Sequence, residues 1–240
     1  MKDNTQIKER FVVFLDIMGF KDRVARSNAE DLYRELTEFN LAITKIINSF
    51  KQNGAESVSE QNDTSVTMLL GDNNSIELAQ FSDSIVLFSN NNSGENLRKI
   101  SEAAKKIMLC AINREKPIPL KGALAEGLIT CDTTKQLFFG QALIDAYLLE
   151  ENVQYYGIVV HHSAEKSVIK LQDEHLFRNC EVPLKSGKIE HYELVWHDDP
   201  ETDISAGLDR IRLSVSDSPR KYVDNTKSIY KKNTQTTVFK

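Results

Sequence analysis

Apolar residues change their spacing along the chain, and each spacing predicts a different secondary-structure element. Residues 11–18 form a nearly continuous apolar run rich in Val and Phe, which is typical of a buried strand. From 21 to 50 the apolar residues recur at helical spacing, with a break at Ser27-Asn28 that predicts a short turn before a long helix. The polar stretch 51–64 then predicts a surface loop.

Short strands and helices are expected over the rest of the chain. Residues 76–81 and 84–89 predict a β-hairpin whose turn carries Asp83, and a further strand is expected at 66–70. The later elements are, in order, a helix at 96–113, strands at 120–129 and 136–139, a helix at 140–151, a strand at 158–162, a helix at 164–171, strands near 180–184 and 189–196, and a helical tail over 204–230 that breaks near Ser218-Pro219.

The order of the first elements predicts the fold class. Strand, helix, strand, strand, helix, strand is the ferredoxin-like βαββαβ pattern of the α+β class, here extended by a C-terminal β-hairpin and a helical tail. The expected boundaries are an N-terminal tail over 1–10, one domain over 11–196 and a C-terminal helical extension over 197–240.

Composition narrows the classes of protein and partner. The 240 residues are 40% hydrophobic and 27% charged, as in an ordinary globular domain. The net charge of −5 argues against nucleic acid as a partner. The longest apolar run, from Phe11 to Leu15, is too short to cross a membrane, and the polar N-terminus lacks a signal-peptide pattern. Three scattered cysteines form neither a zinc pattern nor an even disulfide set, so we expect a reduced, cytoplasmic protein.

Two aspartates stand where buried strands end. Asp16 follows the first apolar run, and Asp83 occupies the hairpin turn. The predicted topology puts the first strand beside this hairpin, so the two carboxylates can meet although they are far apart in sequence. Since an unpaired buried carboxylate is costly, we expect them to bind two Mg²⁺ or Mn²⁺ ions with the Ile17 carbonyl as a third oxygen ligand. The alternative for either residue is an ordinary turn former or helix cap.

Anion-binding groups are expected beside these aspartates. The turn at Gly19 and Phe20 would present backbone N–H groups at the start of a helix, which suits phosphates. Lys121, at the start of a strand, is a candidate phosphate contact, with a solvated edge lysine as the alternative. His161 and His162 are neighbours on an expected strand and would face opposite sides, so we interpret them as structural rather than as metal ligands.

Several segments resemble the motifs of class III nucleotidyl cyclases. The segments 14–20 and 81–83 resemble the F-x-D-I-x-G-F signature and the second metal-Asp turn of that family. The strand 121–127 is similar to the R-x-G-I-x-x-G strand, the helix 139–150 looks like the W-G-x-x-V-N-x-A-x-R-x-E helix, and the segments 184–188 and 192–194 resemble the late hairpin. The resemblance spans residues 11–196 and implies a palm-like nucleotide cyclase domain, with Asp16 and Asp83 as metal ligands and Lys121 replacing the family's Arg.

The departures from these motifs point to a subgroup. The transition-state Asn and Arg of the family fall on Ile144 and Leu148, and its purine-reading Lys and Asp fall on Ala79 and Leu137. Retained metal aspartates with an apolar base pocket look like the Pycsar pyrimidine cyclases of bacterial anti-phage defence, which make cyclic UMP or cyclic CMP.

That resemblance implies a specific activity and set of partners. UTP would be converted to 3′,5′-cyclic UMP and pyrophosphate, with UTP favoured over CTP by analogy. The protein would be a homodimer with active sites at the subunit interface, and a separate cyclic-nucleotide-binding effector would respond to the product. Tyr33 and Tyr147 are candidate readers of the base.

Two other functions are compatible with the residues. A degenerate cyclase domain that binds nucleotide as a sensor would explain the missing Asn and Arg, although Lys121, Lys21 or Arg23 are candidates to replace the lost charge. A polymerase-like or dinucleotide cyclase is disfavoured, because Asp83 stands without a second acidic residue at its turn.

Overall fold

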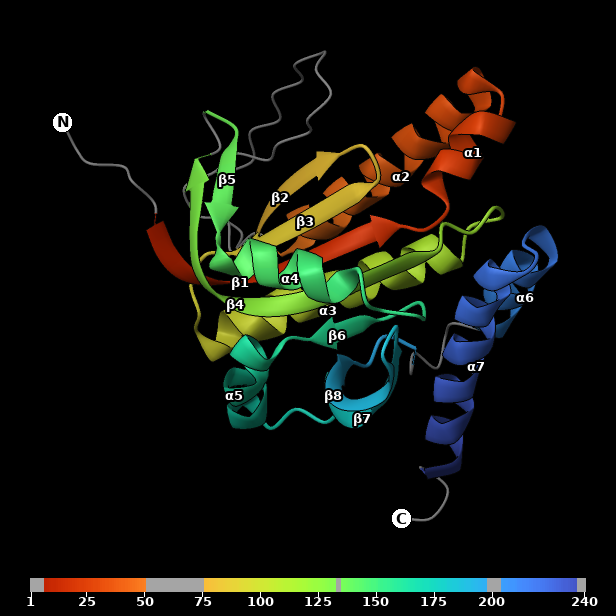
Figure 1. Ribbon diagram of the computed structural model, residues 1–240. Helices are drawn as coiled ribbons and strands as arrows, with labels where there is room; N and C mark the ends of the chain where they lie inside the picture. Colours follow the sequence, from red (N-terminus) through yellow and green to blue (C-terminus); the bar gives the residue numbers. More distant parts are fainter. Residues whose placement is uncertain (1–6, 51–75, 133–134, 198–203, 237–240) are drawn as a thin grey trace.

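The computed structural model describes residues 7–50, 76–132, 135–197 and 204–236 (Figure 1). The predicted loop over 51–64 and the predicted strand over 66–70 lie outside these residues. The elements are β1 (Ile7–Ile17), α1 (Phe20–Arg26), α2 (Ala29–Ser49), β2 (Ile76–Phe81), β3 (Ser84–Ser89), α3 (Gly94–Ile112), β4 (Leu120–Asp132), β5 (Leu137–Gly140), α4 (Gln141–Glu150), β6 (Ile158–Val160), α5 (His162–Leu171), β7 (Phe177–Leu184), β8 (Gly187–Leu194), α6 (Ile204–Ser214) and α7 (Ser218–Thr236).

The described strands confirm the ferredoxin-like prediction. Their order in the sheet is β2-β3-β1-β4-β6-β8-β7, and β5 pairs with β4 outside this path. The first four strands have the split arrangement of a βαββαβ unit, since β3 lies between β1 and β2 and runs antiparallel to both. The later strands extend the sheet through β6, which runs parallel to β4.

Alternation along β1 gives the sheet two different faces. Phe11, Val13 and Leu15 are buried against α2 and α3, which cover one face. Val12 and Phe14 point the other way, into an apolar cluster that includes Ala142 and Ala146 of α4. Figure 1 shows α4 crossing the near face of the sheet, with α2 and α3 behind it. Asp16 continues the α4-facing set, so its side chain lies on that face.

Local signals explain where the long helices begin. Asn28 caps α2, because its side-chain oxygen accepts a hydrogen bond from Glu30 N at 2.8 Å. Ser93 caps α3 in the same way through Asn96 N. The predicted break at Ser27-Asn28 is therefore confirmed.

Two local predictions are wrong. The first strand begins at Ile7 rather than at residue 11, because Arg10 is fully buried and its guanidinium donates to Glu77 and to the Ser89 carbonyl. The strand near 158–162 ends at Val160, so His161 is not a strand residue. Its ring nitrogen instead caps α5 by accepting from Ser163 N. The rings of His161 and His162 then lie 4.0 Å apart rather than on opposite sides.

The C-terminal segment is helical and packs on the domain. The predicted break is confirmed, since α6 and α7 are separate helices on either side of residues 215–217. In Figure 1 both helices lie on the right-hand side of the molecule, and α6 packs against α3. Among the described helices, none is long and apolar enough to cross a membrane.

Candidate functional site

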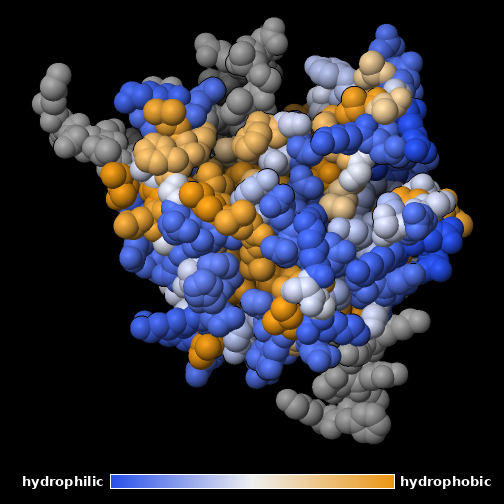
Figure 2. All heavy atoms as spheres, in the orientation of Figure 1, coloured by the Kyte–Doolittle hydropathy of each residue, from blue (hydrophilic) through white to orange (hydrophobic). Residues whose placement is uncertain are grey.

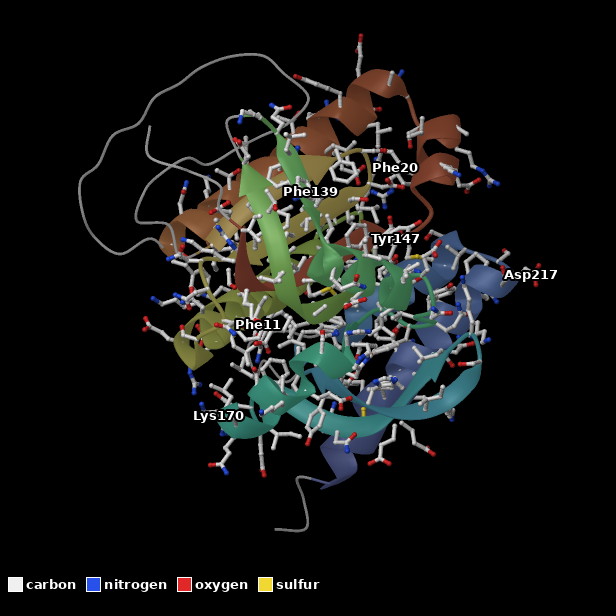
Figure 3. The ribbon with its side chains drawn as sticks, turned by 60° about the vertical axis from the view of Figure 1, so that its left-hand side comes forward. Phe11, Phe20, Phe139, Tyr147, Lys170 and Asp217 are labelled. Atoms are coloured by element: carbon white, nitrogen blue, oxygen red, sulfur yellow. The ribbon has the colours of Figure 1, made fainter. Side chains whose placement is uncertain are left out.

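A hollow of about 370 Å³ opens where β1 ends and the β2–β3 turn passes it. It brings together six of the residues predicted to form the site, which are Asp16, Ile17, Gly19, Phe20, Asp83 and Lys121. Met18 and Lys21, from the turn after β1 and the start of α1, also border it. The remaining lining residues come from later parts of the chain: Tyr147, Glu150, Glu151, Lys185 and Tyr222. Figure 3 labels Phe20 and Tyr147, which reach this region from α1 and α4.

The backbone places the two aspartates side by side. Asp16 pairs with Ser84 of β3, directly after Asp83, and Ile17 N donates to the Asp83 carbonyl at 2.9 Å. Burial and then the nearby Asp83 carboxylate raise the pKa of Asp16, while Lys121 on the neighbouring strand opposes the shift. Neither carboxylate forms a hydrogen bond or ion pair with another described residue.

These two carboxylates suit a hard divalent cation. Mg²⁺ is commonly held by one or two protein carboxylates, with the remaining positions filled by water and substrate phosphates. Over the described part of the chain, no cluster of three or more His, Cys, Asp or Glu side chains is arranged to hold a metal. The donor set therefore fits an ion shared with a phosphate ligand better than a closed structural site.

Lys121 is buried and paired. It is 6% exposed on the central strand β4, and its Nζ lies 2.8 Å from Glu150 Oε1 and donates to the Glu150 carbonyl at 2.9 Å. The alternative of a solvated edge lysine is therefore wrong. Burial raises the pKa of Glu150, and Lys121 opposes that shift. A lysine has three N–H donors, so the two contacts with Glu150 leave one for a ligand.

The turn after β1 leads directly into α1. Gly19 adopts a left-handed backbone with φ 73° and precedes α1, whose first N–H groups donate to no capping side chain. Lys21 also borders the hollow. Arg23 is committed elsewhere, because its guanidinium contacts Glu35 and donates to the Pro117 carbonyl.

The proposed base-reading residues lie apart from this hollow. Ala79 is buried in the apolar cluster beneath α4, and Leu137 is half exposed on β5. Neither borders the hollow around the aspartates. Tyr33 lines a separate cavity of about 530 Å³ between α2 and the β2–β3 turn, which no charged side chain borders among the described residues. Tyr147 does border the hollow, with its ring edge-on to Phe14 at 5.5 Å.

Three further side chains were missed in the sequence. Glu150 ends the helix that resembles a family motif, which is the one signal that pointed to it. Lys185 lies in the turn between β7 and β8, and Tyr222 lies on α7, beyond the residues that carry the resemblance. No pattern in the sequence connects Tyr222 with the two aspartates.

The raised pKa of Asp16 predicts a change in stability. Ionising this carboxyl costs more in the folded than in the unfolded chain, so stability is lost as the pH rises above the ordinary value of 3.8 through the raised value. We expect Asp16→Asn to raise the free energy of unfolding of the metal-free protein near neutral pH. The gain should be below about 1 kcal/mol, because water screens a half-exposed carboxyl. Denaturant unfolding at about pH 7 and about pH 3 measures it. A gain that persists at the acid pH would contradict this electrostatic cause.

Comparisons with known proteins identify the fold. No family model matches the sequence, and no curated protein matches it. Among solved structures, the chain is similar to the catalytic core of a rhodopsin-guanylyl cyclase with converted specificity, crystallised in complex with ATPαS. The TM-score is 0.55 at 14% sequence identity, and the match covers 78% of this chain and 95% of that chain. The described domain therefore has the fold of a nucleotide cyclase catalytic core.

Proposed function

We propose that this chain is a nucleotide cyclase that converts UTP to 3′,5′-cyclic UMP and pyrophosphate. The observation that carries the proposal is the pair Asp16 and Asp83. The two lie side by side where β1 ends in a cyclase-core fold, and neither carboxylate has a hydrogen bond or ion pair with another described residue. Burial and the nearby Asp83 carboxylate raise the pKa of Asp16, so the ionised pair is an unfavourable arrangement when no cation is bound. A bound cation removes the repulsion.

The residues around the pair have distinct roles in this reaction. Asp16, Asp83 and the Ile17 carbonyl would hold two Mg²⁺ or Mn²⁺ ions, which supply Lewis-acid polarisation of the phosphate and of the attacking hydroxyl. The ribose 3′-oxygen bonds to the α-phosphorus, its proton goes to solvent, and the bond to the β-phosphate oxygen breaks to release pyrophosphate. The N–H groups at Gly19 and Phe20 and the ammonium of Lys121 would bind phosphate oxygens.

The choice of a pyrimidine rests on the sequence resemblance alone, because Ala79 and Leu137 do not border the hollow. Ala79 and Leu137 stand where a purine cyclase would carry a Lys and an Asp, and apolar side chains cannot read a purine through hydrogen bonds. By the same resemblance, CTP is the alternative substrate, and the product would act on a separate effector in bacterial antiviral defence.

An exposed apolar surface supports a homodimer. Figure 2 shows hydrophobic residues gathered over β4, β5 and α4. The exposed apolar side chains on these three elements are Leu128, Leu137, Phe139, Ile144, Tyr147 and Leu148. An apolar surface of this kind favours burial against a second copy, and Tyr147 links it to the hollow.

Disrupting this surface tests the dimer. We expect Phe139→Glu to give a monomer by light scattering and to lose cyclase activity, because it places a charge where apolar side chains would meet. Ile169→Glu on α5 is the matched control, since Ile169 is equally exposed but lies off this surface. A Phe139→Glu variant that remains dimeric would contradict the assignment of the interface.

A second function, a nucleotide sensor without turnover, is favoured by one observation. Lys121 is held by Glu150, and the positions of the missing Asn and Arg carry the exposed apolar residues Ile144 and Leu148. Purified protein incubated separately with ATP, GTP, CTP and UTP plus Mn²⁺, with products identified by mass spectrometry, separates the two functions. Formation of cyclic UMP would confirm the proposal. Formation of cyclic CMP would show that the substrate is CTP. Tight binding with no cyclic product indicates a sensor.

A further inference from the structure

Helix α7 is fixed against the loop that follows α4. Asn225 Nδ2 donates to the Gln154 carbonyl at 2.7 Å, and Tyr156 N donates to Thr226 Oγ1 at 2.9 Å. Val223 and Thr226 are buried, at 0% and 2% exposure. The helix is therefore packed into the domain, and the loop that it holds begins directly after Glu150.

These contacts orient Tyr222 toward the hollow. Its hydroxyl oxygen accepts a hydrogen bond from Gln154 Nε2 at 2.9 Å, and its ring stacks on Tyr156 with centroids 6.0 Å apart. Among the described residues the Tyr222 O–H has no acceptor of its own. Because Gln154 donates to the phenol oxygen, the phenol proton is available to donate to a ligand.

A cation, Lys185, lies near Tyr222 in the hollow and can share an anionic ligand with the phenol. Tyr222 borders the same hollow as Asp16 and Asp83 and interacts electrostatically with Lys185 and Glu150. The Glu150 carboxylate is paired with Lys121, and the Lys185 ammonium is a cation that acts on the phenol from the same hollow. Burial raises the pKa of Tyr222, against the opposing effects of Gln154 and Lys185, so the phenol stays a donor near neutral pH.

We propose that α7 is a wall of the active site and that the Tyr222 O–H donates a hydrogen bond to a phosphate oxygen of the bound nucleotide, beside Lys185. This inference rests on the proposed function, because it assigns a phosphate ligand to the same hollow. It gives the C-terminal extension a direct role in binding the part of the substrate that leaves as pyrophosphate.

The test compares Tyr222→Phe with Tyr230→Phe in the full chain. Tyr230 lies on the same helix, packs edge-on against the His197 ring and does not border the hollow, so its variant controls for losing a phenol hydroxyl from α7. Calorimetric titration with Mg²⁺ uses two probes, α,β-methylene-UTP and inorganic pyrophosphate. We expect Tyr222→Phe to weaken the binding of both probes by about tenfold to a hundredfold, which is the usual effect of losing a hydrogen bond to a charged group. Tyr230→Phe should match the wild type.

A second variant separates ligand contact from structural support. Gln154→Leu removes the donor behind the phenol but keeps the Tyr222 hydroxyl, so it should weaken pyrophosphate binding less than Tyr222→Phe does. If Gln154→Leu and Tyr222→Phe lose the same pyrophosphate affinity and the same Tm, Tyr222 only anchors the loop. That result would overturn the inference.

The remaining outcomes distinguish this inference from the proposed function. If the wild-type chain binds neither probe, the proposed function fails and the inference fails with it. If the wild type binds both and Tyr222→Phe binds them equally well, only the inference fails. Weakened binding of α,β-methylene-UTP with unchanged pyrophosphate binding would also overturn it, because the phenol would then contact the nucleoside.

Discussion

Asp83→Asn is expected to lower cyclic nucleotide formation by about 10³-fold or more while leaving the fold intact. The substitution keeps the size of the side chain and removes one of the two charges that would hold the metal ions. Losing several kcal/mol of charge stabilisation at the transition state corresponds to a rate loss of this size. The Asp83 side chain forms no hydrogen bond or ion pair with another described residue, and its backbone carbonyl, which accepts from Ile17 N, is unchanged.

The measurement is the rate of product formation as a function of Mn²⁺ concentration, with Tm measured alongside. Asp22→Asn is the matched control, because Asp22 lies nearby on α1 but pairs with Arg26 at the surface. It should keep wild-type activity. Full activity of Asp83→Asn at low Mn²⁺ would exclude Asp83 as a metal ligand and remove the main support for the proposed enzyme.

The two aspartates could be found from the sequence because each breaks a simple pattern. Asp16 follows an apolar strand and Asp83 lies in a hairpin turn, so both carboxylates are predicted at strand ends. The βαββαβ order then predicts that these two strand ends lie side by side. This inference needs only the period of the strands and the order of the elements. The pairing of β1 with β3 confirms that arrangement.

The rest of the hollow depends on contacts that no local pattern encodes. A glutamate at the end of a helix is normally solvated. The motif resemblance marks Glu150, but it does not show that Glu150 is the buried partner of Lys121. Arg10 was missed for the same reason. A charged residue just before an apolar run normally predicts the end of a solvated tail, whereas here Glu77 on β2 pairs with the buried guanidinium. Tyr222 reaches the hollow only through the docking of α7, which is a tertiary event.

The pair Lys121 and Glu150 gives the second large expected effect. Glu150→Leu should destabilise the protein by about 3–5 kcal/mol, because it leaves the Lys121 ammonium buried without its partner. Both side chains are almost fully buried, at 8% and 4% exposure, so solvent cannot compensate the lost charge. Denaturant unfolding of the metal-free protein measures this loss.

The double variant Lys121→Met with Glu150→Leu separates stability from catalysis. Replacing a buried ion pair by apolar side chains of similar volume is often close to neutral, so most of the stability lost in Glu150→Leu should return. Activity should not return: if the free N–H of Lys121 contacts phosphate, turnover stays about 10²-fold below wild type even in the stable double variant. A double variant with wild-type turnover would show that the pair serves only to join β4 to the end of α4, and that the phosphate is bound by other groups in the hollow.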